Sequence, residues 1–138
     1  MFFLKKTTVF LIVLVLLVFA RPNLTTAAMS PHPLDLYERG EALIEHYQGN
    51  VINLVQAQEI FIDLISKYPR SPFGYLGMSH IYRLDAYLGN DQYNIDLIRN
   101  RALPFALQAM RLGPSIREVH ENYVFFEKFL QEDVANHN

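Results

Sequence analysis

Hydrophobic residues recur along most of the chain after residue 30 with the three- and four-residue spacing of amphipathic helices. Prolines, glycines and capping residues divide this pattern into segments, because each of them favours the beginning or the end of a helix. No stretch of useful length alternates with a period of two, so we expect no sheet. The pattern predicts an all-α chain of about five helices, at residues 35–47, 53–68, 73–88 and 100–112 and after residue 115.

The expected beginnings of the helices follow from local capping chemistry. Asn53 is the expected cap of the second helix, and Ser71-Pro72 would supply the cap and the first residue of the third. Leu88 closes the apolar face of that third helix, and Gly89 ends it. Residues 115–118 (Ser-Ile-Arg-Glu) fit a capping box, in which serine and glutamate satisfy free N–H groups at the start of the fifth helix.

Pro104 determines where the fourth helix is expected to begin. Proline has no N–H, which does no harm in a first turn but breaks the interior of a helix. A start near Asn100 therefore fits better than a start near Asn94, and residues 90–96 are expected to form a polar loop.

The arrangement of small and large residues in the second helix returns in the fourth. Four positions recur 45 residues later: Ala57, Phe61, Leu64 and Pro69 return as Ala102, Ala106, Ala109 and Pro114. The preceding helices echo each other with Leu36 and Gly40 in one and Phe73 and Gly77 in the next. Small residues let helices approach closely, so this pattern indicates helical hairpins that bury their faces by stacking.

The chain resembles the tetratricopeptide repeat family. The resemblance rests on the two repeated blocks, on Leu76-Gly77 and on the nearby Tyr82. The resemblance covers residues 35–130 and implies an antiparallel helix-hairpin solenoid of two pairs plus a fifth helix. The period is stretched from 34 residues to 45, and alanine stands at position 106 where the family has a large residue, so the array would be degenerate. Members usually bind peptides or proteins on the concave face, and few are enzymes, so the resemblance implies a non-catalytic interaction module.

The same resemblance places the partner-binding residues on the first helix of each pair and on the fifth helix. These residues are Tyr37, Glu41, Met78, Tyr82, Glu121, Phe125 and Lys128. Helical spacing also puts Phe125 beside Phe129, next to the main apolar stripe of the fifth helix. The two rings either widen the buried face or form an exposed patch that docks a partner or a second copy.

Residues 1–28 have the pattern of an export signal: two lysines, an apolar run and a small-residue end. The apolar run is about 14 residues long, whereas a spanning helix usually needs about 20. An uncleaved anchor, with membrane contact through residues 1–22, is the alternative. A stiff linker is expected at residues 29–34, the helical domain at 35–133 and a polar tail at 134–138. In both cases this domain is expected outside the cytoplasm, in the periplasm.

Composition adds three constraints. The hydrophobic content is 51% for the whole chain, but it falls to about 46% after residue 28, which is ordinary for a globular domain. All fourteen acidic residues and nine of the twelve basic ones follow residue 28, so this part carries a net charge of −5, which argues against nucleic acid as a partner. The absence of cysteine excludes disulfides, catalytic thiols, thiolate zinc sites and lipid-modified cysteines.

Local motifs for catalysis or metal binding are weak. None of the five histidines lies four residues from another, the spacing of helical metal ligands. Asp91, Asn94 and Asp96 have suitable oxygens for calcium but lack the glycine and the closing glutamate of a calcium loop. We therefore expect no catalytic residue, no metal and no cofactor.

Three functions remain open at this stage. The leading one is an exported adaptor that binds another protein in the periplasm or at a membrane, for envelope assembly or a transporter. The second is an accessory subunit of a membrane complex, held by an uncleaved N-terminal helix. The third is a small-ligand-binding protein whose pocket lies among Tyr75, Tyr82, Tyr87 and Tyr93. A homo-oligomer is compatible with each of them.

Overall fold

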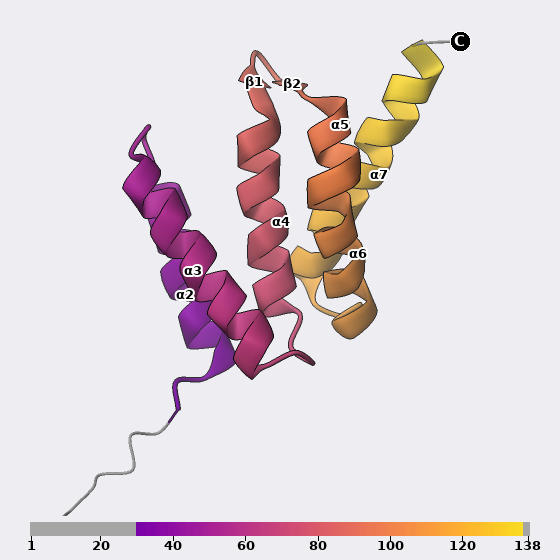
Figure 1. Ribbon diagram of the computed structural model, residues 1–138. Helices are drawn as coiled ribbons and strands as arrows, with labels where there is room; N and C mark the ends of the chain where they lie inside the picture. The colour runs from indigo at the N-terminus through magenta and orange to yellow at the C-terminus, as the bar shows by residue number, and fades with distance from the viewer. Residues whose placement is uncertain (1–29, 137–138) are drawn as a thin grey trace, which may run out of the picture. The chain divides into compact units, whose positions relative to one another are not determined.

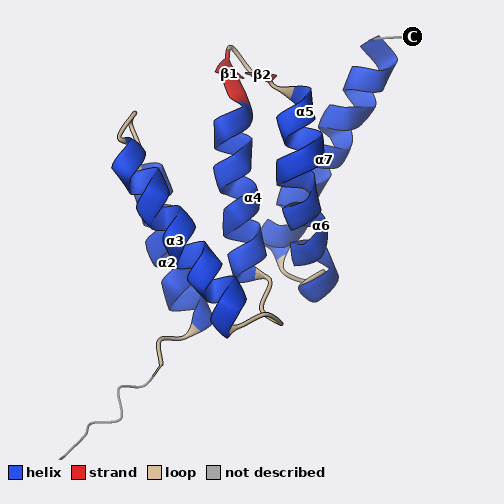
Figure 2. Ribbon diagram, viewed as in Figure 1, coloured by secondary structure: helices blue, strands red, loops and turns tan. Residues whose placement is uncertain are grey.

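The computed structural model describes residues 30–136, and from Pro31 onward they belong to one compact unit (Figure 1). This unit is built of helices and one short β-hairpin (Figure 2), so the prediction of a mostly helical chain is confirmed. Within residues 30–136, no helix has the length and hydrophobicity that crossing a bilayer requires. The expected signal or anchor at residues 1–28 lies outside the described residues.

The helices follow one another in space much as they do along the chain. α2 packs against α3, α3 against α4, α4 against the segment that ends in α6, and α6 against α7 (Figure 1). The elements are α2 (Pro33–Glu45), α3 (Val51–Lys67), α4 (Phe73–Ala86), β1 (Tyr87–Gly89), β2 (Gln92–Tyr93), α5 (Ile95–Leu97), the π-helical turn η1 (Ile98–Ala102), α6 (Leu103–Leu112) and α7 (Arg117–Asn136). α2 thus begins inside the expected linker, and α7 continues past residue 133.

The ring of Phe61 on α3 lies at the centre of the first core cluster, where α2, α3 and α4 meet. Phe61 is fully buried, and a Cβ atom at either Gly40 on α2 or Gly77 on α4 would overlap its ring. Both neighbouring helices therefore need glycine for the ring to fit between them. This contact gives the echo of Gly40 and Gly77 in the sequence a physical reason.

A second core cluster joins the end of α4 to η1, α6 and α7. Its buried members are Ala86, Ile98, Ala102, Ala106 and Phe126. The apolar positions of the internal repeat are buried in both copies: Ala57, Phe61, Leu64, Ala102, Ala106 and Ala109. Alanine at position 106 leaves room beside the large Phe126 ring in this cluster.

The expected cap of α3 was wrong by three residues. The side chain of Asn50 accepts a hydrogen bond of 3.1 Å from the N–H of Ile52, so Asn50 is the cap. The chain reverses through Gln48 and Gly49, both with positive φ, and this tight turn lets the helix begin at Val51. Asn53 lies inside the helix and donates a 2.8 Å hydrogen bond to the carbonyl of His46.

The starts of α4 and α7 also differ from the expected ones. α4 begins at Phe73, whose N–H donates to Ser71 Oγ at 3.4 Å, so Pro72 is the cap position instead of the first helical residue. α7 begins at Arg117, which places Ile116 at its cap position in place of Ser115. The carboxylate of Glu118 instead accepts a hydrogen bond from another helix, described below.

The segment after α4 forms a β-hairpin, so the expectation of no sheet was wrong at this point. α4 ends at Ala86, Tyr87 pairs with Tyr93 across two antiparallel strands, and Leu88 is 66% exposed instead of buried. Asn90 and Asp91 both have positive φ, as in the tight turns that match the twist of hairpin strands. Strands of three and two residues are too short to show an alternating pattern.

The fourth helical segment begins near Asn94 and not near Asn100. Asn94 caps it by accepting a 3.1 Å hydrogen bond from the N–H of Leu97. The helix then continues through Pro104 because η1 widens it by one residue, and the N–H of Leu103 bonds to the carbonyl of Ile98. The wide turn gives the proline ring the room that a regular helix denies it.

Candidate functional site

One face of the unit, formed by α2, α4, α7 and the β-hairpin, contains a cavity of about 640 Å³. Charged and polar side chains from three helices line it: Glu41, His80, Arg83, Glu118, Glu121 and Asn122. The hairpin adds Tyr87, Asp91 and Tyr93. Two further hollows each lie along a single pair of helices, α2 with α3 and α6 with α7. We call the first hollow the acidic cavity, after its four carboxylates Glu41, Asp91, Glu118 and Glu121.

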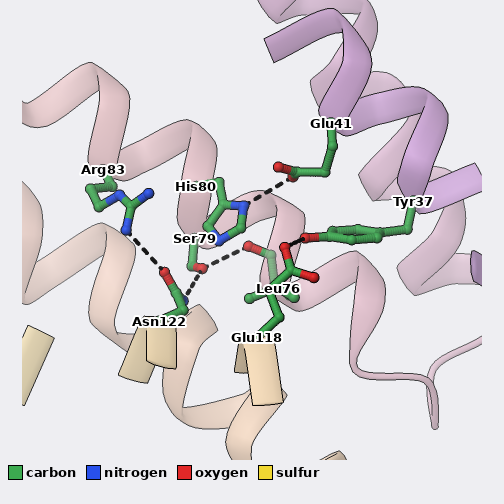
Figure 3. Close-up of polar contacts among 8 residues, drawn as sticks. All are labelled: Tyr37, Glu41, Leu76, Ser79, His80, Arg83, Glu118 and Asn122. Atoms are coloured by element: carbon green, nitrogen blue, oxygen red, sulfur yellow. Dashed lines mark hydrogen bonds and ion pairs between the residues drawn. The ribbon is translucent and has the colours of Figure 1, made fainter. Parts of the chain in front are cut away.

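Two hydrogen-bonded pairs connect α2 to the other walls of the acidic cavity (Figure 3). The hydroxyl of Tyr37 donates to Glu118 Oε1 at 2.6 Å, which joins α2 to α7. Nδ1 of His80 lies 3.0 Å from Glu41 Oε1, which joins α4 to α2. The His80 and Glu41 side chains are only 11% and 23% exposed, so water screens this pair little.

A third set of bonds joins α4 to α7 beneath the acidic cavity. Ser79 Oγ donates to the carbonyl of Leu76 at 2.7 Å and accepts from Asn122 Nδ2 at 2.8 Å (Figure 3). Arg83 Nη1 lies 3.5 Å from Asn122 Oδ1, a long and weak contact. Within the described part of the chain, every buried side-chain nitrogen and oxygen has a hydrogen-bond partner. The walls of the cavity are therefore held by a satisfied polar network.

The network keeps Tyr37 neutral. Its side chain is buried, and burial raises the pKa of the phenol well above its usual value; the negative charge of Glu41 and the bond to Glu118 raise it further. A neutral phenol next to a carboxylate is a strong hydrogen-bond donor. Tyr37 therefore stays a hydrogen-bond donor and orients the Glu118 carboxylate.

The charge of the lining is strongly unbalanced. Four carboxylates face the acidic cavity, and among the described lining residues Arg83 is the one with a permanent positive charge. The Arg83 guanidinium lies 4.9 Å from the centre of the Phe125 ring, a cation–π contact that holds it against α7. Glu121 also lies 3.8 Å from Arg117, but both side chains are largely exposed, so this pair is weak.

The predicted partner-binding residues lie in three different environments. Glu41 and Glu121 line the acidic cavity. Tyr37 and Met78 are buried in the first core cluster, and Tyr82 is half-buried and stacks on Phe105. The structure thus brings Glu41 and Glu121 together and uses Tyr37 beneath them, as the donor to Glu118.

The three predicted residues at 125, 128 and 129 lie further along α7. Phe125 and Phe129 are half-buried, and both rings lie nearly perpendicular to the Tyr93 ring, at 5.7 and 5.3 Å between centres. They belong to the second core cluster, and their role in docking a partner stays a prediction. Lys128 is exposed and is not part of the lining of the acidic cavity.

The four tyrosines expected around a ligand pocket do not surround one. Tyr87 and Tyr93 line the acidic cavity, with ring centres 5.3 Å apart. Tyr75 and Tyr82 are not part of its lining, since Tyr75 points its hydroxyl toward the carbonyl of Pro69 and Tyr82 stacks on α6. Of these four tyrosines, only the two on the hairpin therefore line the acidic cavity.

His80, Arg83, Glu118 and Asn122 were not identified from the sequence. Their partners are distant along the chain, 39 residues for His80 with Glu41 and 81 residues for Tyr37 with Glu118, so no local spacing reveals them. Asn122 carried one visible signal. It is a polar residue within the apolar stripe of α7 between Val119 and Phe126, and such a residue needs a buried partner.

Comparisons of the chain with family models, with curated proteins and with solved structures give no match. Membership of the tetratricopeptide family therefore stays a prediction from the sequence. The function has to be inferred from the chemistry of the acidic cavity.

Proposed function

We propose that this protein is a non-catalytic binding module that holds a basic segment of another protein in the acidic cavity. The observation that carries this proposal is the four carboxylates that line the acidic cavity from α2, α7 and the hairpin, against Arg83 as the one permanent cation of the described lining. Such a lining attracts lysine and arginine side chains and raises their rate of encounter.

The walls suit a preformed site. Tyr37, Ser79 and Asn122 join three helices through hydrogen bonds that are buried or partly buried, so little ordering is needed when a partner binds. Tyr87 and Tyr93 at the hairpin add aromatic surface, which is enriched at protein interfaces. A volume of about 640 Å³ is sufficient for one or two long side chains of a peptide, with the rest of the partner outside.

The order of the helices supports a repeat-type architecture for the same module. α2 and α4 are the first helices of two successive hairpins, and α7 would begin a third. These three helices line the acidic cavity together, which is where the tetratricopeptide resemblance places a partner. We include in the proposal that residues 1–28 direct this module out of the cytoplasm, as a periplasmic or membrane-associated adaptor.

A labelled peptide rich in arginine and lysine, compared with a glutamate-rich peptide of equal length, tests the proposal by fluorescence anisotropy on the full-length chain. We expect salt-sensitive binding of the basic peptide alone. The double substitution Glu118→Gln with Glu121→Gln should weaken binding by about tenfold, since each charge contributes roughly 0.7 kcal/mol at a partly exposed site.

The matched control removes two charges from the same molecule outside the cavity, with Glu38→Gln and Glu45→Gln on the exposed side of α2. This control should change binding by less than about twofold at moderate salt. Equal losses in both variants would mean that net charge, and not the acidic cavity, attracts the peptide. A melting shift with a small ligand and no peptide binding would favour the small-ligand alternative.

A further inference from the structure

Three potential metal ligands from three separate helices meet in the acidic cavity. Glu41 on α2, His80 on α4 and Glu118 on α7 each offer one ligand atom, and these atoms all lie within 4.8 Å of one another. Nδ1 of His80 and Oε1 of Glu41 are already 3.0 Å apart. Figure 3 shows the imidazole between the two carboxylate-bearing helices.

The distances suit a small tetrahedral ion. Zinc binds histidine nitrogen and carboxylate oxygen at about 2.0–2.2 Å, which places tetrahedral ligand atoms about 3.3 Å from each other. The observed spacing therefore needs a closure of at most about 1.5 Å, which rotation of the two glutamate side chains supplies. Calcium and magnesium prefer six or more oxygen ligands, whereas imidazole favours zinc and its neighbours in the transition series.

A second observation concerns the group behind the ligands. Tyr37 is 3% exposed and donates a 2.6 Å hydrogen bond to Oε1 of Glu118, so Oε2 is the oxygen of this carboxylate that Tyr37 leaves for an ion. Metal-binding carboxylates commonly have such an outer partner, which orients the ligand. Tyr37 lies one turn before Glu41 on α2, so a single helix supplies both a ligand and the residue that orients another.

We propose that Glu41, His80 and Glu118 form a binding site for a divalent ion of the zinc class, with a fourth position open to the acidic cavity. The site goes beyond the proposed partner binding and does not depend on it. A bound ion neutralises two of the four carboxylates and joins α2, α4 and α7. A bound ion therefore lowers the affinity for a basic peptide, and a bound peptide lowers the affinity for the ion by the same factor.

Calorimetric titration of the full-length chain with zinc chloride tests the site directly. We expect one ion per chain, and His80→Gln and Glu118→Gln should each lower the affinity at least about tenfold. Both substitutions replace the ligand with a glutamine amide, which can still form hydrogen bonds. His120→Gln and Glu59→Gln are the matched controls, because both residues are exposed and lie outside the lining of the acidic cavity. The zinc affinity of these two variants should stay within about twofold of that of the unaltered chain.

Two measurements on the unaltered chain keep the test decisive if a variant fails to fold. Cobalt(II) should give the visible absorption of a four-coordinate site, and zinc should shift the ring signals of one of the five histidines, His80, in the NMR spectrum. Absence of saturable zinc binding, equal affinity in His80→Gln, or a shift at other histidines alone would overturn the proposal. The peptide assay is run with a chelator, so failure of the metal site and failure of partner binding are separate results.

Discussion

The hydroxyl of Tyr37 donates a 2.6 Å hydrogen bond to Oε1 of Glu118, which lies 81 residues later in the sequence. This bond joins the first described helix to the last, across the face that contains the acidic cavity. It also orients Glu118, which provides one of the four carboxylates of that cavity.

Replacing Tyr37 with phenylalanine should lower the free energy of unfolding by about 1–2 kcal/mol, because the substitution removes one charge-assisted hydrogen bond while the ring remains buried. Urea unfolding followed by circular dichroism measures this change. Tyr75→Phe is the matched control, since its hydroxyl makes only a 3.5 Å contact, and it should cost less than about 0.5 kcal/mol. Equal costs for both variants would show that the bond to Glu118 contributes nothing.

The raised pKa of Tyr37 predicts an alkaline dependence. Burial, then the charge of Glu41 and the bond to Glu118, raise the pKa of the phenol in the folded state above its unfolded value of about 10. The stability it contributes is therefore complete below about pH 10 and is lost as pH rises toward the folded-state pKa. Tyrosinate absorbance should show at least one of the eight tyrosines ionising only on unfolding. If the tyrosine that ionises only on unfolding is absent in Tyr37→Phe, it is Tyr37. If it is still present in that variant, the assignment to Tyr37 is contradicted.

The contact of Gly77 with Phe61 predicts a coupled pair of substitutions. Gly77→Ala places a methyl group on the Phe61 ring, and such overpacking typically costs about 1–3 kcal/mol. Adding Phe61→Leu should recover part of this loss, because the smaller side chain vacates the space that the methyl group needs. Thermal unfolding of the two single variants and the double variant measures the coupling. Strictly additive costs would mean that the two positions do not touch.

The π-helical turn before Pro104 predicts that this proline is tolerated without strain. Pro104→Ala should change the free energy of unfolding by less than about 1 kcal/mol, whereas a new proline in the regular part of α6, Leu107→Pro, should cost about 3 kcal/mol or more. Chemical unfolding of both variants tests this difference. An increase of several kcal/mol in the free energy of unfolding of Pro104→Ala would show that the native proline distorts the helix.

Local patterns in the sequence predicted the helices and much of the core. The three- and four-residue spacing placed Ala57, Phe61 and Leu64 on the buried face of α3, and the internal repeat placed Ala102 and Ala109 in the core. These predictions succeed because each depends on one helix and its burial. The echo of Gly40 and Gly77 was visible in the sequence, but the fit of the Phe61 ring between these two glycines was not predicted.

The features that the sequence did not reveal depend on contacts between distant parts of the chain or on uncommon backbone conformations. The Asn90-Asp91 turn forms a hairpin too short for a period to show, and η1 accommodates a proline by a change of helix type. The meeting of Glu41, His80 and Glu118 requires α2, α4 and α7 to be placed side by side, which no local spacing records. The acidic cavity therefore became visible only with the packing of the helices.

Amide chemical-shift mapping of the full-length chain, titrated with the basic peptide, tests the central claim most directly. The claim predicts shifts that concentrate on the face of α2, α4 and α7, at Glu41, His80, Glu118 and Glu121 and at the hairpin. Shifts that concentrate instead on the apolar groove between α6 and α7, at Leu103, Leu107 and Val134, would contradict it.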